Sequence, residues 1–351
     1  MKISKKRIFN TLFVIIVFLI TVWTVFKDED LGQVFEYISS SDIRYIIPAV
    51  FCVIFFILGE AVNIYYLLRR LGTKVSFWHC SLYSFIGFFY SCITPSASGG
   101  QPLQMIAMRK DKIPLAVSTI VLAIVTITYK FVLVLIGAVI LIFRPDSLMV
   151  YIEPCEELIY IGMGLNVIVI TLLLLAVFFP HIIRSLATGI MKGINRIRPF
   201  KNPKKQYDRL ERILGQYEGT SDFFRHHIGV IFNVFVITLL QRFILFTVTW
   251  FTYLSFNMHG TSFTVVTCLQ AMISVASDMM PTPGGMGVSE NMFIAIFQPV
   301  FTEPLVVPAM VISRGISYYT QLFISAVMTF LSSFIIKEKS TDTSVKGELN
   351  E

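Results

Sequence analysis

Charge is the first property that this sequence has little of. Only 15% of its 351 residues are Asp, Glu, Lys or Arg, whereas 55% are hydrophobic and 32 are Phe. The mean hydropathy is +0.72, and a soluble domain of this length cannot bury so much apolar surface. Repeated apolar runs of about 18 or more residues are typical of transmembrane helices. The composition therefore predicts a membrane protein with several spans.

Cysteine and cofactor motifs are scarce as well. The five cysteines show no metal-ligand spacing, and four of them lie in apolar runs: Cys52, Cys80, Cys92, Cys155 and Cys268. We interpret them as packing residues and predict neither a disulfide framework nor a metal site. No nucleotide-binding motif is visible, so we expect no cofactor and no direct use of ATP.

Seven apolar regions divide the chain. The first, Ile8 to Phe26, follows a basic N-terminus as in a signal peptide, but it ends in bulky residues without a cleavage site. We interpret it as an uncleaved span. The other regions are 44–68, 76–93, 113–143, 157–179, 228–256 and 261–336. The last region is too long for one element, and we place a full span at 304–336 within it.

Basic residues in short loops orient these spans, because they are retained on the cytosolic side. Placing both termini, the loop after residue 68, the segment before residue 113 and the segment 180–227 in the cytosol puts 23 of the 29 Lys and Arg residues there. The opposite loops are acidic. We predict a multi-pass membrane protein with both termini in the cytosol.

Two regions must then enter and leave the membrane on the same side. The stretch 76–112 has cytosolic flanks at both ends, and its middle reads TPSASGGQP. The stretch 261–303 begins and ends outside, with PTPGGMGVSE at its turn. Irregular backbone at this depth is tolerated only where it is buried in protein or lines a wet cavity. The sequence predicts re-entrant hairpins at 76–110 and 261–302.

The two halves have the same order of elements in opposite orientation. Repeat one covers about 8–143 and repeat two about 157–336, each with two spans, a hairpin and a span. Lys130 follows Gly100 by 30 positions, and Arg314 follows Gly285 by 29. Such inverted repeats are typical of transporters with a substrate site at the midplane; coincidence among hydrophobic segments is the alternative. We expect a single domain over 1–336, an all-α polytopic membrane protein with six full spans plus two hairpins, or eight spans if the hairpins are counted.

Six ionisable residues fall in or beside the apolar elements: Glu60, Lys130, Arg242, Asp278, Glu290 and Arg314. Each is costly in lipid. In one interpretation the three cations and three carboxylates neutralise one another as structural pairs, with Glu290 beside Arg314 or Arg242. In the other, cations facing a cavity bind an anionic headgroup. We take these six residues and Gln101 as the candidate headgroup path and predict no catalytic residue.

The hairpin turns supply the remaining candidate residues, namely Pro95, Gly99, Gly100, Pro283, Gly284, Gly285 and Gly287. Helices that begin after Gly100 and Gly285 would direct their N-termini toward the centre and favour an anion there.

The cytosolic segment 180–227 carries apolar residues at helical spacing, from Ile183 and Leu186 to Ile197, among basic ones. This pattern predicts an amphipathic helix on the anionic inner leaflet. A second amphipathic piece places Tyr207, Leu210, Leu214 and Tyr217 on one face. Nucleic-acid binding is the rival interpretation, which the shortness of this membrane-flanked segment disfavours. We expect a disordered tail at 337–351.

One motif resembles a known family. PTPGGMGVSE is similar to the P-x-P-G-G-x-G-x-x-E signature of the membrane domain of bacterial lysylphosphatidylglycerol synthase/flippase proteins, matching at Pro281, Pro283, Gly284, Gly285, Gly287 and Glu290. TPSASGGQPLQM resembles that family's first hairpin, and the resemblance spans about 8–336. It implies a flippase that moves aminoacylated phosphatidylglycerol to the outer leaflet and confers resistance to cationic peptides.

Full-length members of that family also carry a soluble C-terminal domain that transfers lysine from lysyl-tRNA. Only a short tail follows residue 336 here, so we expect no lysyl transfer by this chain alone. The leading hypothesis is a flippase or scramblase for an anionic or aminoacylated phospholipid such as lysyl-phosphatidylglycerol. The alternatives are a phosphatidylglycerol lysyltransferase that acts with a separate synthase domain, and a membrane scaffold for a lipid-modifying enzyme. Candidate partners are the phospholipid, a separate synthase or glycosyltransferase, and a second copy of the chain.

Overall fold

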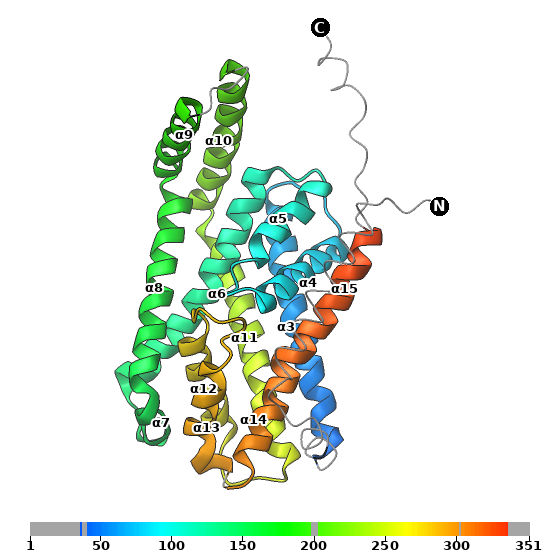
Figure 1. Cartoon of the computed structure of the whole chain (residues 1–351), viewed down its shortest axis with the longest axis vertical. Coiled ribbons are helices and arrows are strands. Elements are labelled where there is room, and N and C mark those ends of the chain that lie inside the picture. The colour runs from blue at the N-terminus through cyan, green and yellow to red at the C-terminus, as the bar shows by residue number, and fades with distance from the viewer. Residues whose placement is uncertain (1–35, 37–40, 198–202, 302, 336–351) are drawn as a thin grey trace.

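The computed structural model describes residues 36, 41–197, 203–301 and 303–335 (Figure 1). The expected first span at 8–26 and the tail at 337–351 lie outside the described residues. Within the described ranges the chain forms helices, turns and one isolated β-bridge. The protein is an all-α polytopic membrane protein, as the composition predicted.

The described helices run in chain order as α3 (Ile43–Arg70), α4 (Phe77–Ile93), α5 (Gly100–Lys110), α6 (Leu115–Phe143), α7 (Asp146–Ile152), η1 (Glu153–Cys155), α8 (Glu156–Phe178), α9 (Pro180–Ile197), α10 (Pro203–His226), α11 (Ile228–Ser255), α12 (Phe263–Ser277), α13 (Val288–Phe301), α14 (Val306–Arg314), η2 (Gly315–Thr320) and α15 (Gln321–Ile335). Four stretches in the described part are long and apolar enough to cross a membrane: α3, α6, 146–178 and α11. They correspond to four of the predicted spans.

The predicted span at 304–336 is one helical run over 306–335, in which α14, the π-helix η2 and α15 follow one another without a gap. The wider π turn directly follows Arg314, and the Thr320 hydroxyl donates a hydrogen bond to the Gly315 carbonyl inside it (3.0 Å). Such single π segments frequently mark functional sites. This one lies directly after Arg314, one of the candidate residues.

Both predicted hairpins are present as pairs of short helices. The first helix of each starts with a serine N-cap: Ser76 Oγ accepts from the His79 amide, and Ser262 Oγ accepts from the Val265 amide. Such caps satisfy amide groups that a helix start leaves without partners. In Figure 1 the α4–α5 hairpin occupies the upper half of the molecule and the α12–α13 hairpin the lower half, with their turns toward each other.

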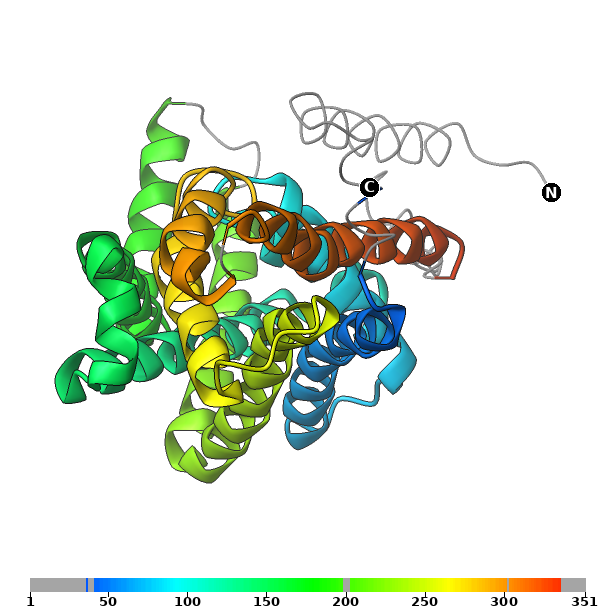
Figure 2. The same cartoon turned by 90° about the horizontal axis from the view of Figure 1, so that it is seen from below.

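The long helices pack around these hairpins. α3 lies along α11, and α4 packs against α15 and α3; Figure 2, which looks along the long axis, shows α3 in blue beside α11 in yellow-green. One apolar cluster joins α3, α4 and α6, and another joins α12 and α13 to α6 and α11. The fold therefore fixes both turns between the long helices.

The segment 180–227 forms two helices, as predicted, but their direction is different. In Figure 1, α9 and α10 extend along the long axis beyond the other helices instead of lying across it. Arg184 Nε donates to Glu218 (2.8 Å) and pairs with Glu211, which holds α9 against α10. The Tyr217 hydroxyl donates to the Ala176 carbonyl (2.9 Å) and ties α10 to the end of α8. The apolar stripe of α9 stays exposed, and its binding to lipid remains a prediction.

Candidate functional site

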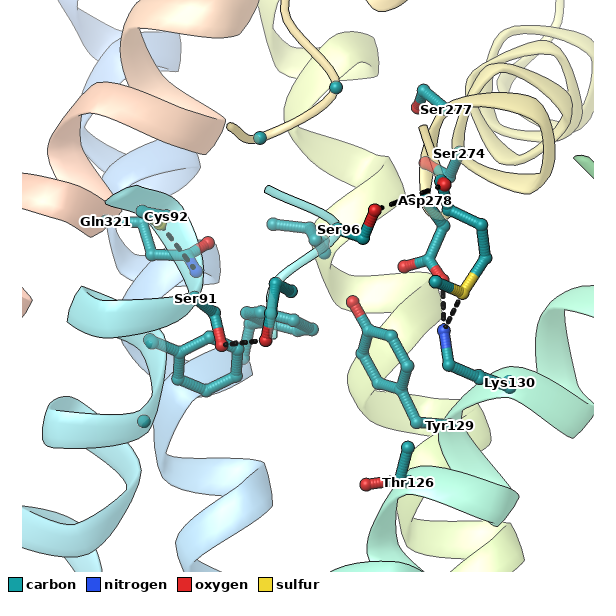
Figure 3. Close-up of a pocket in the computed structure, with 18 of the residues that line it drawn as sticks. Ser91, Cys92, Ser96, Thr126, Tyr129, Lys130, Ser274, Ser277, Asp278 and Gln321 are labelled. Atoms are coloured by element: carbon teal, nitrogen blue, oxygen red, sulfur yellow. Dashed lines mark hydrogen bonds and ion pairs between the residues drawn. The ribbon is translucent and has the colours of Figure 1, made fainter. Parts of the chain in front are cut away.

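The two hairpin turns meet at the centre of the fold. Pro95 and Pro283 form an antiparallel β-bridge, although 188 positions separate them in the sequence. The Ser96 hydroxyl donates to the carbonyl groups of Met279 (3.4 Å) and Met280 (3.2 Å). Figure 3 shows Ser96 reaching the second turn. The two turns therefore contact each other directly, and part of their irregular backbone is paired within the protein, as backbone at this depth requires.

Three glycines of the second turn adopt backbone angles that disfavour other residues. Gly284, Gly285 and Gly287 have φ values of +59°, +68° and +83°, in the left-handed region that glycine reaches without strain. A Cβ atom on Gly284 would also overlap the Tyr318 ring. The Tyr318 hydroxyl donates to the Cys92 carbonyl (2.8 Å), so this close approach links the second turn to α4.

The first turn uses its glycines differently. Its left-handed residues are Ser96 (φ 49°) and Ala97 (φ 54°), not Gly99 or Gly100. A Cβ atom on Gly100 would lie 2.7 Å from the Gly87 carbonyl oxygen, so Gly100 permits α5 to start close against α4. α5 begins at Gly100, close to the predicted position, but α13 begins at Val288, three residues later than Gly285. The later start follows from the left-handed run of glycines.

Lys130, Arg242 and Asp278 form one buried charge cluster. Lys130 Nζ donates to Asp278 Oδ2 (2.7 Å) and to Asn166 Oδ1 (3.4 Å). Arg242 Nη2 lies 3.6 Å from Asp278 Oδ1, a distance too long for a hydrogen bond. Figure 3 shows Lys130 extending from α6 toward Asp278. Two cations therefore share one carboxylate, and the cluster carries a surplus positive charge.

Arg242 is the cation of this cluster that has unused donors. Its side chain is only 3% exposed, and its Nε and Nη2 atoms have no hydrogen-bond partner within the described part of the chain. The guanidinium lies over the Tyr129 ring, with Cζ 3.2 Å from the ring centroid. Buried guanidinium N–H groups without acceptors are costly. This geometry is suited to an anionic group that supplies the missing oxygens.

Arg314 and Glu290 form the second pair. Arg314 Nε donates to Glu290 Oε1 (2.8 Å), and Nη2 donates to the Gly284 carbonyl (3.1 Å). Glu290 Oε2 accepts from the Gly287 amide (2.7 Å) and the Ser289 hydroxyl (2.9 Å). Of the two partners proposed for Glu290, the structure selects Arg314 over Arg242. The Glu290 carboxylate therefore joins Arg314 to the backbone of the second turn.

Glu60 has a different environment. Its Oε1 atom accepts a hydrogen bond from Gln104 Nε2 (2.6 Å), and no ion pair to Glu60 occurs among the described residues. Gln104 packs so closely on α4 that a Cβ atom on Gly87 would overlap its amide. Gln101 on the same helix donates to Thr126 Oγ1 (2.5 Å) on α6. Glu60 is thus a carboxyl group without a cationic partner in this region.

A cavity of about 380 Å³ connects these groups. Of the sequence-predicted path, Glu60, Gln101, Lys130, Arg242, Asp278 and Arg314 line it, whereas Glu290 lies behind Arg314 and is not among the lining residues. Residues that sequence reasoning did not select also line it, including Thr126 and Tyr129. Their aromatic and hydroxyl side chains carry no distinctive sequence signal in a chain with 14 Tyr residues. The volume falls within the usual range of small-ligand sites.

Comparison with known families identifies the chain. The family model described as the lysylphosphatidylglycerol synthase TM region matches residues 11–325. The chain belongs to this family. No curated protein matches it. The match covers both hairpins and every described residue that lines the cavity, so the cavity lies within the matched region.

Proposed function

We propose that this protein is a lipid flippase or scramblase, which moves an anionic or aminoacylated phospholipid, such as lysyl-phosphatidylglycerol, across the bacterial cytoplasmic membrane. The observation that carries the proposal is Arg242, a buried cation at the wall of a central cavity whose Nε and Nη2 groups have no hydrogen-bond partner among the described residues. Guanidinium groups bind phosphate oxygens through several N–H donors at once. The phosphodiester of a lipid headgroup supplies such oxygens.

The cavity also has the polar character that a headgroup needs. Ser91, Ser98 and Thr126 contribute hydroxyl groups to its wall, and Gln101 and Gln321 contribute amides. A glycerol or aminoacyl headgroup can exchange hydrogen bonds with water for hydrogen bonds with these groups. The acyl chains would remain in the surrounding lipid. Movement of a headgroup past two turns that meet at Pro95 and Pro283 requires the turns to separate and close again, which corresponds to alternating access.

Family membership supports the same class of substrate, because the family is described by a lysyl-phospholipid pathway. The distribution of basic residues supports an orientation with both termini in the cytosol. We further propose that the resulting outward movement of lysylated lipid lowers the negative surface charge and confers resistance to cationic peptides.

Reconstituted vesicles test the proposal. Labelled phosphatidylglycerol and its lysyl ester are placed in both leaflets of proteoliposomes, and a membrane-impermeant reductant removes the outer-leaflet label at once. Further loss of label, from lipid that began in the inner leaflet, reports translocation. We expect translocation by the wild type, and a loss of about tenfold or more in Arg242→Gln, the scale of one charged hydrogen bond. Arg209→Gln, at an exposed position on α10, is the matched control and should equal the wild type. Absence of translocation in the wild type would refute the function for these lipids.

A further inference from the structure

The charges around the cavity do not have equivalent partners. Asp278 lies between Lys130 and Arg242, and Glu290 is paired with Arg314. Glu60, in contrast, accepts from a neutral amide, Gln104. A carboxylate in a protein interior is usually stabilised by a cation or by several hydrogen-bond donors, and no ion pair to Glu60 occurs among the described residues. Glu60 is therefore the carboxyl group of this site that can exchange a proton without breaking an ion pair.

The protonation state of Glu60 decides the net charge of the site. Ionised, it balances the surplus cation of the Lys130–Asp278–Arg242 cluster, and the charges around the cavity sum to zero. Protonated, it leaves one uncompensated positive charge in the cavity. A phosphodiester headgroup carries one negative charge. It therefore complements the positive charge of the cavity when Glu60 is protonated, and it is repelled when Glu60 is ionised. Proton binding and anion binding at this site must then favour each other.

We propose that Glu60 couples proton uptake to the binding of an anionic phospholipid headgroup in the cavity. The carboxylate takes a proton from cavity water as the headgroup enters, and the resulting carboxylic acid returns the proton to water as the headgroup leaves. This inference rests on the proposed lipid translocation. It gives the transport cycle a proton stoichiometry of about one per anionic lipid.

Among the titratable groups that line the cavity, Glu60 is the one that we expect to change its protonation state, because the others are ion-paired or neutral. The elements packed on α3 are α4, α6, α11, η2 and α15. The charged groups that face the cavity from these elements and the adjoining turns are held in the two ion-paired sets: Lys130, Arg242 and Asp278, and Arg314 with Glu290 behind it. The remaining titratable groups are Cys92, Tyr129 and Tyr318. Thiols and phenols are neutral at pH values below about 8.

Direct proton measurement tests the coupling. Short-chain phosphatidylglycerol is titrated into the purified full chain in detergent, in weak buffer, between about pH 5 and about pH 8. For the wild type we expect uptake of up to about one proton per lipid at the upper pH, and a Kd that rises by up to about tenfold per pH unit. Glu60→Gln keeps an oxygen that can accept from Gln104, and it should bind with the low-pH affinity at every pH, without proton uptake. Glu157→Gln, an exposed position, should match the wild type.

Four results would overturn the inference, and they are distinguishable. Lipid binding by the wild type without proton uptake and without pH dependence would refute the coupling and leave the proposed function standing. A Glu60→Gln variant that keeps the full pH dependence would place the proton elsewhere. In a parallel titration with lysyl-phosphatidylglycerol, selectively weaker binding of this lipid by Glu60→Gln at all pH values would assign Glu60 to the lysyl ammonium group instead. No lipid binding at any pH would refute the proposed function and the inference with it.

Discussion

Asp278→Asn tests the charge cluster that forms one wall of the cavity. Asp278 is the carboxylate shared by Lys130 (2.7 Å) and Arg242 (3.6 Å). The side chains of Asp278, Lys130 and Arg242 are 15%, 10% and 3% exposed. The substitution should therefore lower the free energy of unfolding as the breaking of a buried ion pair does, and not as the breaking of a surface pair does. Removing one partner of a buried pair costs about 3–5 kcal/mol. Because two cations are left without a counter-charge here, we expect the upper part of that range.

Lys130→Met gives the comparison that makes this prediction specific. The substitution removes the shortest contact of the cluster, but Asp278 and Arg242 still balance each other. We therefore expect a loss near the average for single substitutions, about 1 kcal/mol. The free energy of unfolding is measured by denaturant titration of purified protein in mild detergent, with Glu157→Gln as the surface control. A loss in Lys130→Met that equals or exceeds the loss in Asp278→Asn would refute the shared-carboxylate arrangement.

The remaining predictions concern the second turn. Gly284→Ala should lose about 1–2 kcal/mol from left-handed strain and about 1–3 kcal/mol more from overlap with the Tyr318 ring. Gly287→Ala, which also has a positive φ but no atom within 4 Å of the added Cβ, should lose the strain contribution alone, so equal losses in the two variants would contradict the packing seen at Gly284. Tyr318→Phe removes the hydrogen bond to the Cys92 carbonyl and should cost about 1 kcal/mol in the same unfolding measurement; an unchanged stability would show that this bond does not hold the turn to α4.

Local sequence signals predicted much of the fold. The long apolar runs gave the positions of α3, α6, α8 and α11 because length and hydropathy alone determine them. Glycine and proline gave the positions of both turns, since such residues interrupt helices wherever they gather. The η2 π-helix was not predicted, because Gly315–Thr320 carries no signal that separates it from an α-helix. Ser96 and Ala97, which bear the left-handed angles of the first turn, gave no signal either.

The candidate site was predictable as a set of residues and not as a geometry. Isolated charges in apolar runs are costly, and this cost alone selected Glu60, Lys130, Arg242 and Asp278. Their pairing depends on how α3, α6, α11 and α12 pack, which spacing along the chain does not determine. The sequence predicted that Asp278 pairs with a cation. It did not predict that two cations share this carboxylate, because the sharing depends on how the helices pack. The different environment of Glu60 likewise depends on Gln104, which reaches it from α5.

Mapping the headgroup directly on the protein tests the central claim, that a phospholipid headgroup passes through the cavity between the two turns. Phosphatidylglycerol with a photoreactive diazirine in its headgroup is incorporated into vesicles with the full chain, and cross-linked residues are located by mass spectrometry. The account predicts adducts on the cavity wall, at residues such as Thr126 and Tyr129, that decrease in Arg242→Gln. Adducts confined to exposed lipid-facing positions such as Val139, and unchanged in the variant, would contradict it.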